Sequence, residues 1–170
     1  MHIGNSAGVI QLKNLPGNMI RPGIMLYGYF PDEALKNKIN LQPCCKLKSK
    51  ISFLKEVDEG TSISYGRTYT TTKKTKLANV PIGYADGIRR SLSNKGNVVI
   101  NEKIVPIVGT VCMDSFMIDV TQIENVKIGD EVFIWDNKNI TVEDIAKQCG
   151  TINYEILSTI SNRVIRKVEE

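Results

Sequence analysis

From about residue 46 onward, apolar and polar residues alternate along the chain with a period of two. One face of the first such stretch carries Leu47, Ser49, Ile51, Phe53, Lys55 and Val57. A period of two is typical of a half-exposed β-strand, because successive side chains point to opposite faces of a sheet. The pattern therefore predicts one long strand, which ends at the turn Asp58-Glu59-Gly60.

Further short apolar stretches follow, and glycine, asparagine and aspartate residues separate them. The expected strands cover residues 75–82, 97–100, 103–108, 116–120 and 131–135. Several short strands at this spacing are typical of an antiparallel sandwich or barrel.

The end of the chain predicts two short helices and a last strand. Thr141 can cap a helix over residues 142–148, with Asp144 in the capping-box position and Gly150 just after its end. Asn153 is the expected cap of a second helix that runs to about Ile160. Residues 164–168 are expected to form a final strand.

The first 30 residues have a different character. A short helical turn is expected at residues 9–12, and Leu15-Pro16-Gly17-Asn18 has the composition of a turn. The apolar run at 19–28, interrupted by Arg21, favours a buried strand and the loop after it, as in an α/β barrel. We therefore place a boundary near residue 40 and expect a mainly β protein after it.

Composition and charge narrow the classes of protein that fit. The 170 residues are 42% hydrophobic and 24% charged, which is usual for a globular protein. The net charge of +4 is mild, and the basic residues are not interleaved with aromatic ones, so no nucleic acid is expected as a partner. No apolar run approaches the roughly 20 residues that span a bilayer, and the chain does not start like a secretory signal.

Cysteine and histidine usage argues against a metal site. The four cysteines form no CxxC pair, and the chain has a single histidine. Adjacent cysteines such as Cys44 and Cys45 rarely bridge each other, because the geometry is strained. We expect free, mostly buried thiols in a reducing cytoplasm.

Three stretches place reactive side chains at the ends of expected strands. They are Ser64-Tyr65-Gly66-Arg67-Thr68-Tyr69, Pro81-Ile82-Gly83-Tyr84-Ala85-Asp86-Gly87 and Val108-Gly109-Thr110-Val111-Cys112-Met113-Asp114. Taken singly, each is more typical of a turn than of a functional site.

Together, these stretches resemble the alanine racemase family. Three flanking motifs keep the same order: His2-Ile3-Gly4-Asn5-Ser6, Arg21-Pro22-Gly23-Ile24 and Gly150-Thr151-Ile152-Asn153-Tyr154-Glu155. The resemblance covers the whole chain and implies a (β/α)8 barrel that holds pyridoxal phosphate, followed by a C-terminal β domain. Residues 1–40 would then be the end of the barrel, and residues 41–170 the β domain, with antiparallel barrel-like or sandwich-like strands and two short helices. Two subunits would pair head to tail as a homodimer.

The resemblance makes Tyr65 the acid/base that handles the α-proton on one face of alanine. Racemisation needs a second group on the opposite face, which in the family is the lysine that anchors the cofactor. That lysine has no counterpart in these 170 residues, so we expect the chain by itself to be inactive. Without the resemblance, the favoured interpretation of Tyr65 would be a tyrosine packed at a strand end with its hydroxyl bonded to backbone.

The resemblance also implies a set of cofactor contacts. Arg21 would face the pyridine nitrogen and donate a hydrogen bond to it, because a guanidinium does not give up its proton. His2 would support that arginine from behind, although a lone histidine near a terminus is as often simply solvated. The remaining expected cofactor-binding residues, which include the phosphate cradle, are Asn5, Ser6, Gly23, Ile24 and Tyr154.

The resemblance also implies four residues that control substrate access or lie by the substrate carboxylate: Tyr84, Arg90, Met113 and Asp114. The chain departs from the family at Thr110, where many members have an arginine, so the access corridor has one cation fewer. The resemblance implies D-alanine supply for cell-wall peptidoglycan precursors. Serine or a broader set of amino acids stays open as substrate, and so does a free-standing β domain that only assembles with another chain.

Overall fold

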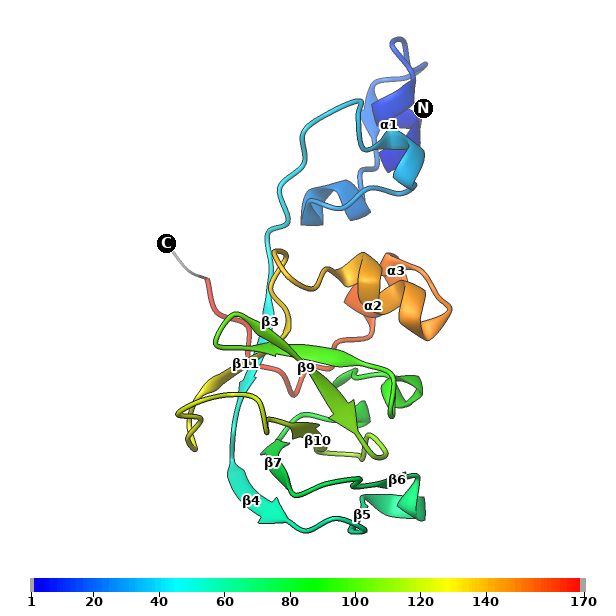
Figure 1. Cartoon of the computed structure of the whole chain (residues 1–170). Helices are drawn as coiled ribbons and strands as arrows, with labels where there is room; N and C mark the ends of the chain where they lie inside the picture. The colour runs from blue at the N-terminus through cyan, green and yellow to red at the C-terminus, as the bar shows by residue number, and fades with distance from the viewer. Residues whose placement is uncertain (1, 169–170) are drawn as a thin grey trace. The chain divides into compact units, whose positions relative to one another are not determined.

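The computed structural model describes residues 2–168, which form two compact units (Figure 1). The first unit extends to Cys45 and the second begins at Lys46. The sequence placed a boundary near residue 40, before the irregular segment that leads to Lys46.

The first unit contains little regular structure. Its elements are β1 (His2–Gly4), α1 (Ser6–Gln11), β2 (Met19–Ile20) and two 3₁₀ helices, Ile24–Tyr27 and Glu33–Leu35. Strands β1 and β2 pair in parallel. The sequence predicted a buried strand and the loop after it within residues 19–28; the strand covers only Met19–Ile20, and both side chains are exposed, so the expected burial is wrong. The strand ends at Ile20 because Pro22 has no N–H group for a strand ladder and the chain turns into a 3₁₀ helix after it.

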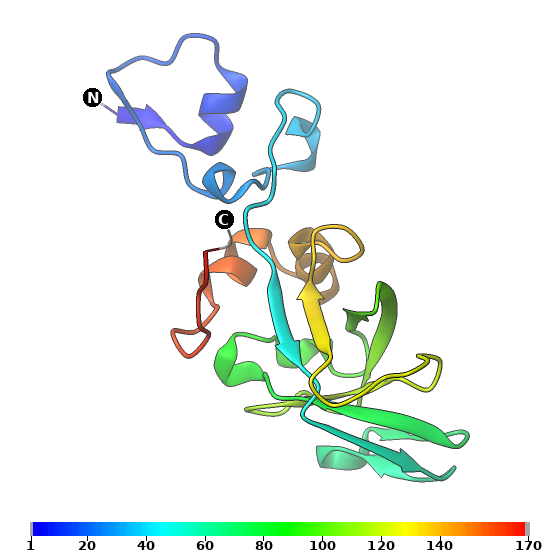
Figure 2. The same ribbon diagram turned by 90° about the vertical axis from the view of Figure 1, so that its left-hand side faces the viewer.

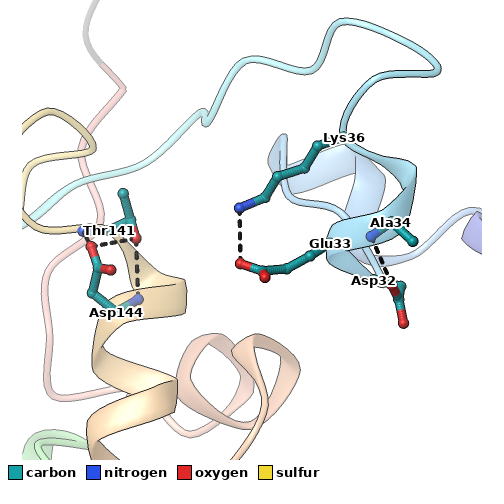
Figure 3. Close-up of polar contacts among 6 residues, drawn as sticks. All are labelled: Asp32, Glu33, Ala34, Lys36, Thr141 and Asp144. Carbon is teal, nitrogen blue, oxygen red and sulfur yellow. Dashed lines mark hydrogen bonds and ion pairs between the residues drawn. The ribbon is translucent and has the colours of Figure 1, made fainter.

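Short polar contacts fix the last turn of the first unit. The Asp32 carboxylate accepts a hydrogen bond from the Ala34 N–H at 2.8 Å, which caps the 3₁₀ helix Glu33–Leu35. Lys36 Nζ lies 3.3 Å from Glu33 Oε1 on the same turn, as Figure 3 shows. Leu35 is buried beneath these exposed residues, so the turn has one apolar anchor and a solvated outer face.

The second unit is built on a curled antiparallel sheet of seven strands, as the sequence predicted. The strands are β3 (Leu47–Lys50), β4 (Phe53–Val57), β7 (Thr75–Val80), β8 (Asn97–Ile100), β9 (Lys103–Val108), β10 (Phe116–Asp119) and β11 (Glu131–Trp135). Their order across the sheet is β3-β11-β8-β9-β10-β7-β4. Leu77, Val98, Ile118 and Val132 are fully buried in its core.

The expected long strand over residues 47–57 is in fact two strands at opposite edges of that order. Ile51 is buried and bonds to the β11 side, through its N–H to Asp130 O at 2.9 Å and its carbonyl to Gly129 N at 2.8 Å. The next residue, Ser52, donates its N–H to Asn79 O on β7 at 3.0 Å. The alternation fails at this joint, because Phe53 is 52% exposed instead of continuing the buried face.

Strand β9 makes a second change of partner. Its first residues pair with β8, from Ile100↔Lys103 to Asn97↔Pro106, whereas Ile107 and Val108 pair with β10. Because both β9 and the 47–57 segment pass between two half-sheets, the sheet curls toward a half-barrel (Figure 2). A small hairpin of β5 (Ser62–Ile63) and β6 (Tyr69–Thr70), which the sequence did not indicate, lies beside β4.

Two short helices pack against each other beside the sheet, α2 (Val142–Cys149) and α3 (Asn153–Ser158) (Figure 1). The expected capping box of α2 is confirmed: Thr141 Oγ1 accepts from Asp144 N at 3.1 Å, and Asp144 Oδ2 accepts from Thr141 N at 2.9 Å (Figure 3). Gly150 ends α2 in the left-handed region, also as expected.

Two expectations for the end of the chain are wrong. Asn153 is the first residue of α3 and not its cap, a position that Ile152 takes without a side-chain hydrogen bond. Residues 164–168 form no strand, and Ile165 and Val168 are exposed at 81% and 94%. A short apolar run becomes a strand only when a sheet edge pairs with it, and residues 164–168 pair with no strand of the described sheets.

Replacement of Thr141 by alanine should lower the stability of the second unit. The variant loses the side-chain acceptor for the Asp144 N–H, and loss of such a cap costs about 0.5–2 kcal/mol of the free energy of unfolding. Urea denaturation followed by circular dichroism measures this quantity. Thr141→Ser keeps the hydroxyl and should stay within a few tenths of a kcal/mol of the parent. Equal stability of the alanine variant and the parent would show that the Thr141–Asp144 capping box does not stabilise the unit.

Candidate active site

The candidate site residues of the second unit gather at one end of the neighbouring strands β7, β9 and β10, which we call this edge of the curled sheet. Strand β7 ends at Val80, which pairs with Phe116 at the start of β10, and β9 ends at Val108, which pairs with Met117. In an antiparallel pair, one strand ends where its neighbour begins. The loops at 81–87 and 109–115 must therefore lie close together. These two loops contain Tyr84, Met113 and Asp114, which the sequence predicted as substrate-binding residues.

The β5–β6 hairpin brings Tyr65 to the same edge. Its tip is a 3₁₀ turn, Tyr65–Arg67, in which the Tyr65 side chain is 78% exposed. Ser64 and Arg67 have positive φ angles of 65° and 49°, a region that side chains other than glycine adopt at a cost of order 1–3 kcal/mol. The Ser64 hydroxyl donates to Thr110 O at 2.7 Å, so the tip touches the 109–115 loop.

Backbone hydrogen bonds join the two loops directly. The N–H groups of Tyr84 and Ala85 donate to the carbonyls of Cys112 and Met113, both at 3.0 Å. Gly83 allows this approach, because a Cβ atom there would lie 2.3 Å from each of these two carbonyl oxygens. Any side chain at position 83 would therefore separate the loops that contain Tyr84 and Met113.

Asp86 and Arg163 tie the loops to the end of the chain. The buried carboxylate of Asp86 accepts from Gly83 N at 2.8 Å and lies 3.3 Å from Arg163 Nε. Arg163 Nη2 donates to Asp114 Oδ1 at 2.6 Å. The pKa of Arg163 is raised, first by its hydrogen bond to Asp114 and then by the charge of Asp86, so the guanidinium stays charged between two carboxylates.

An open groove lies beside the hairpin tip and has a volume of about 640 Å³. Tyr65, Cys112, Ser115 and Phe116 are among its lining residues, together with Phe53 and Met117. Most of the lining is apolar, so the tyrosine hydroxyl stands at the rim of a surface that favours contact with another molecule.

Two further predicted residues lie outside this cluster. Arg90 begins an exposed 3₁₀ turn, Arg90–Leu92, in the segment that follows the 81–87 loop. Tyr154 is 39% exposed on α3, and burial raises the pKa of its hydroxyl. A raised pKa keeps that hydroxyl protonated, and hence a hydrogen-bond donor, at neutral pH.

The predicted cofactor residues other than Tyr154 lie in the first unit. Buried Ser6 accepts hydrogen bonds from the N–H groups of Gly23 at 2.9 Å and Met25 at 3.4 Å. A hydroxyl that accepts two N–H groups still has its own proton to donate, so this cluster around Gly23 and Ile24 can supply donors to an anion.

His2 and Arg21 belong to the paired β1–β2 region, in which Arg21 N donates to Gly4 O at 2.6 Å. In the part of the chain that the structure describes, no hydrogen bond joins their side chains. Asn5 has a local role as the cap of α1, because its side chain accepts from Gly8 N at 2.9 Å.

Sequence reasoning missed Asp86, Arg163 and the contacts of Thr110. Asp86 was visible inside a motif, but its bond to Gly83 depends on a turn that propensity does not specify. Arg163 lies 49 residues from Asp114 in the chain, and no local pattern marks it.

The cysteines and the other potential metal ligands provide no further candidate site. Within the described residues, no disulfide joins the four cysteines. Cys44 is exposed and the other three are only partly buried, so the expectation of mostly buried thiols is wrong. Cys44 lies in the irregular segment before β3, where no sheet covers it. Within residues 2–168, no cluster of potential metal ligands occurs, and no helix has the length and apolarity to cross a membrane.

Fold and site together define a curled antiparallel β domain that presents an exposed tyrosine at its edge. A family model described as the alanine racemase C-terminal domain matches residues 44–168. The chain belongs to the alanine racemase family. Similar proteins include "Alanine racemase 2" of Caldanaerobacter subterraneus subsp. tengcongensis, 49% identical over 97% of this chain, and the alanine racemase of Halothermothrix orenii, 50% identical over 98%. The chain spans less than half of these relatives, 43% and 45% of their lengths.

Solved structures agree with this assignment. Alanine racemase of Clostridium difficile 630 in complex with cycloserine superposes with a TM-score of 0.90 at 45% identity, over 96% of this chain and 44% of that one. Alanine racemase of Bartonella henselae with covalently bound pyridoxal phosphate gives a TM-score of 0.86 at 32% identity, over 95% and 45% of the two chains.

Replacement of Arg163 by methionine should loosen the joined loops without unfolding the domain. The arginine side chain is 54% exposed, so its ion pairs contribute little to global stability, but they hold Asp86 and Asp114 together. Amide hydrogen exchange at Tyr84 and Ala85 should become several-fold faster. Lys138→Met removes a similarly exposed ion pair with Glu102 and should leave these two amides unchanged. Identical exchange in both variants would show that Arg163 does not hold the loops.

Proposed function

We propose that this chain provides the tyrosine-bearing part of an alanine racemase, which interconverts L- and D-alanine with pyridoxal phosphate and supplies D-alanine for peptidoglycan precursors in the cytoplasm. The observation that carries the proposal is Tyr65, whose exposed side chain stands on a strained turn held by backbone contacts. Membership of the alanine racemase family supports the reaction, and the exposed hydroxyl supports the role of a proton donor and acceptor.

The donors of the first unit fit the phosphate of the cofactor. The Ser6 hydroxyl and the backbone around Gly23 and Ile24 suit a dianion, and the protonated hydroxyl of Tyr154 suits it equally. Arg21 would donate a hydrogen bond to the pyridine nitrogen, with His2 and Asn5 in supporting positions. When bound, pyridoxal phosphate supplies an electron sink that stabilises negative charge at the α-carbon of the amino acid.

Tyr65 would hold or remove the proton at Cα on one face of alanine. Its side chain is 78% exposed on its own chain, so it is free to contact a substrate that another molecule holds. A head-to-tail homodimer would provide that other molecule, because the β domain of one subunit then faces the barrel of its partner. The apolar groove beside Tyr65 supports such a contact.

The neighbouring loops would select and orient the substrate. Tyr84 and Arg90 would narrow the path by which the substrate enters, and the backbone of residues 113–114 would face the substrate carboxylate. Arg163 would remain paired with the carboxylates of Asp86 and Asp114. These residues set no size limit that separates alanine from serine, so a broader racemase is the alternative substrate class. An assembly module without catalysis is the alternative function, favoured by the same groove.

The 170-residue polypeptide alone should not racemise alanine. Its residues that match the family motifs include the tyrosine but not the cofactor-anchoring lysine, which a PLP-dependent racemase needs. Circular dichroism of L-alanine incubated with the purified chain and pyridoxal phosphate measures turnover. A second preparation with Tyr65→Phe controls for contaminating host enzyme, and turnover that disappears only in that variant would refute the expectation.

In an enzyme that joins this chain to a barrel, Tyr65→Phe should reduce racemisation strongly and unequally on the two faces. A well-placed general acid/base is worth roughly 10²–10⁴-fold in rate. Solvent deuterium exchange at Cα should fall steeply for L-alanine and survive better for D-alanine, which the opposite base serves. Thermal stability should change little because the ring remains. An equal loss for both enantiomers, or no loss, would remove Tyr65 from this role.

A further inference from the structure

The direction of the Tyr65 side chain depends on its backbone. At 78% exposure the ring has little packing of its own, and the three residues Ser64, Gly66 and Arg67 around it all have positive φ angles. A turn in this conformation persists only where neighbouring contacts determine it. The contacts that fix the backbone at this tip therefore set the direction of the Tyr65 Cα–Cβ bond, which limits where the phenol oxygen can lie.

Thr110 makes the central contact of this kind. Its side chain is buried, with 6% exposure, and its hydroxyl donates to the backbone carbonyl of Tyr65 at 2.8 Å. In return, the hydroxyl of Ser64 donates to the backbone carbonyl of Thr110 at 2.7 Å. Two adjacent residues of the tip are thus bonded to one residue of the 109–115 loop.

Asn94 and Gly109 support these two hydrogen bonds between Thr110 and the tip. Asn94 Oδ1 accepts from Gly109 N at 2.6 Å, and Asn94 Nδ2 donates to Thr68 Oγ1 at 3.0 Å, so a third segment links the loop to the tip. Gly109 has φ +78°, and a Cβ atom there would lie 2.8 Å from Ser64 Cβ. The close approach that Thr110 requires therefore depends on glycine next to it.

We propose that Thr110 is a positioning residue for Tyr65: its hydroxyl holds the Tyr65 carbonyl and thereby directs the phenol oxygen toward the substrate Cα. The inference rests on the function proposed above. The hydrogen bond from Thr110 is short, part-buried and directed at the backbone of Tyr65 itself, so its loss acts on the tip directly. A displacement of about 1 Å in a reacting group can cost on the order of 10²-fold in rate, so a small loosening of the tip is measurable.

The test compares three substitutions in two forms of the protein. Thr110→Val keeps the shape and removes the hydroxyl, whereas Thr110→Ser keeps the hydroxyl. Thr75→Val is the matched control, because Thr75 is also buried and its hydroxyl donates to a backbone carbonyl, that of Lys73, at 2.8 Å. The forms are the 170-residue chain and a hybrid in which the barrel of the Halothermothrix orenii relative precedes this chain.

In the 170-residue chain, the carbonyl ¹³C resonance of Tyr65 reports the bond without any activity. Thr110→Val should shift this resonance, and Thr110→Ser and Thr75→Val should leave it near the parent position. In the hybrid, Thr110→Val should lower kcat on the order of 10- to 100-fold with little change in KM. The loss in Cα deuterium exchange should fall mainly on L-alanine, as for Tyr65→Phe, and Thr110→Ser should restore most of the activity.

The outcomes separate this inference from the proposed function. If Tyr65→Phe behaves as expected but Thr110→Val resembles Thr75→Val, or loses exchange equally for both enantiomers, the positioning role of Thr110 is overturned. If Tyr65→Phe leaves both exchange rates unchanged in an active hybrid, the catalytic role of Tyr65 fails, and the role of Thr110 fails with it. An unshifted Tyr65 carbonyl resonance in Thr110→Val would show that the hydrogen bond from Thr110 to the Tyr65 carbonyl is absent, whatever the activity.

Discussion

Three backbone hydrogen bonds at Ile51 and Ser52 determine the shape of the β domain. They bind one residue to the β11 side of the sheet and the next residue to β7, so a single segment of chain forms both ends of the strand order. Without that change of partner, residues 47–57 would continue as one long strand, and β4 would not pair with β7. Because the sheet curls instead, the ends of β7 and β9 and the start of β10 lie at one edge, where the loops of the candidate site meet.

The site itself is held mainly through backbone atoms. Gly83 and Gly109 bring loops to distances at which a Cβ atom would collide with a neighbouring segment, and carbonyl oxygens of residues 65, 110, 112 and 113 accept the connecting hydrogen bonds. Side chains at Asp86 and Arg163 add a charged link between the loops. Such a construction leaves Tyr65, Tyr84 and Met113 exposed and available for contacts with other molecules.

Local patterns predicted the strands and the capping of α2 because those features depend on neighbouring residues. Short apolar stretches between glycine, asparagine and aspartate residues marked β7 to β11, and the Thr141–Asp144 pair marked a helix start. The joint at Ile51 could not be predicted, since it requires partners at positions 79, 129 and 130. The contacts of Thr110 with the hairpin tip and of Arg163 with Asp114 lie 45 to 49 residues away in the chain, and only folding brings them together. Motif order identified the candidate residues through the family, but it gave no reason for their geometry.

In its proposed role, Tyr65 acts on a substrate held by another molecule, and its side chain is 78% exposed on its own chain. Burial among neighbours, the usual way to fix a reactive group, therefore does not position it, and the backbone that carries it has to do so. Positive φ angles at Ser64 and Arg67 raise the free energy of the turn, and hydrogen bonds to Thr110 offset that strain and fix the backbone of the tip. The strained turn and the buried threonine are thus two parts of one physical requirement: an exposed hydroxyl with a defined position.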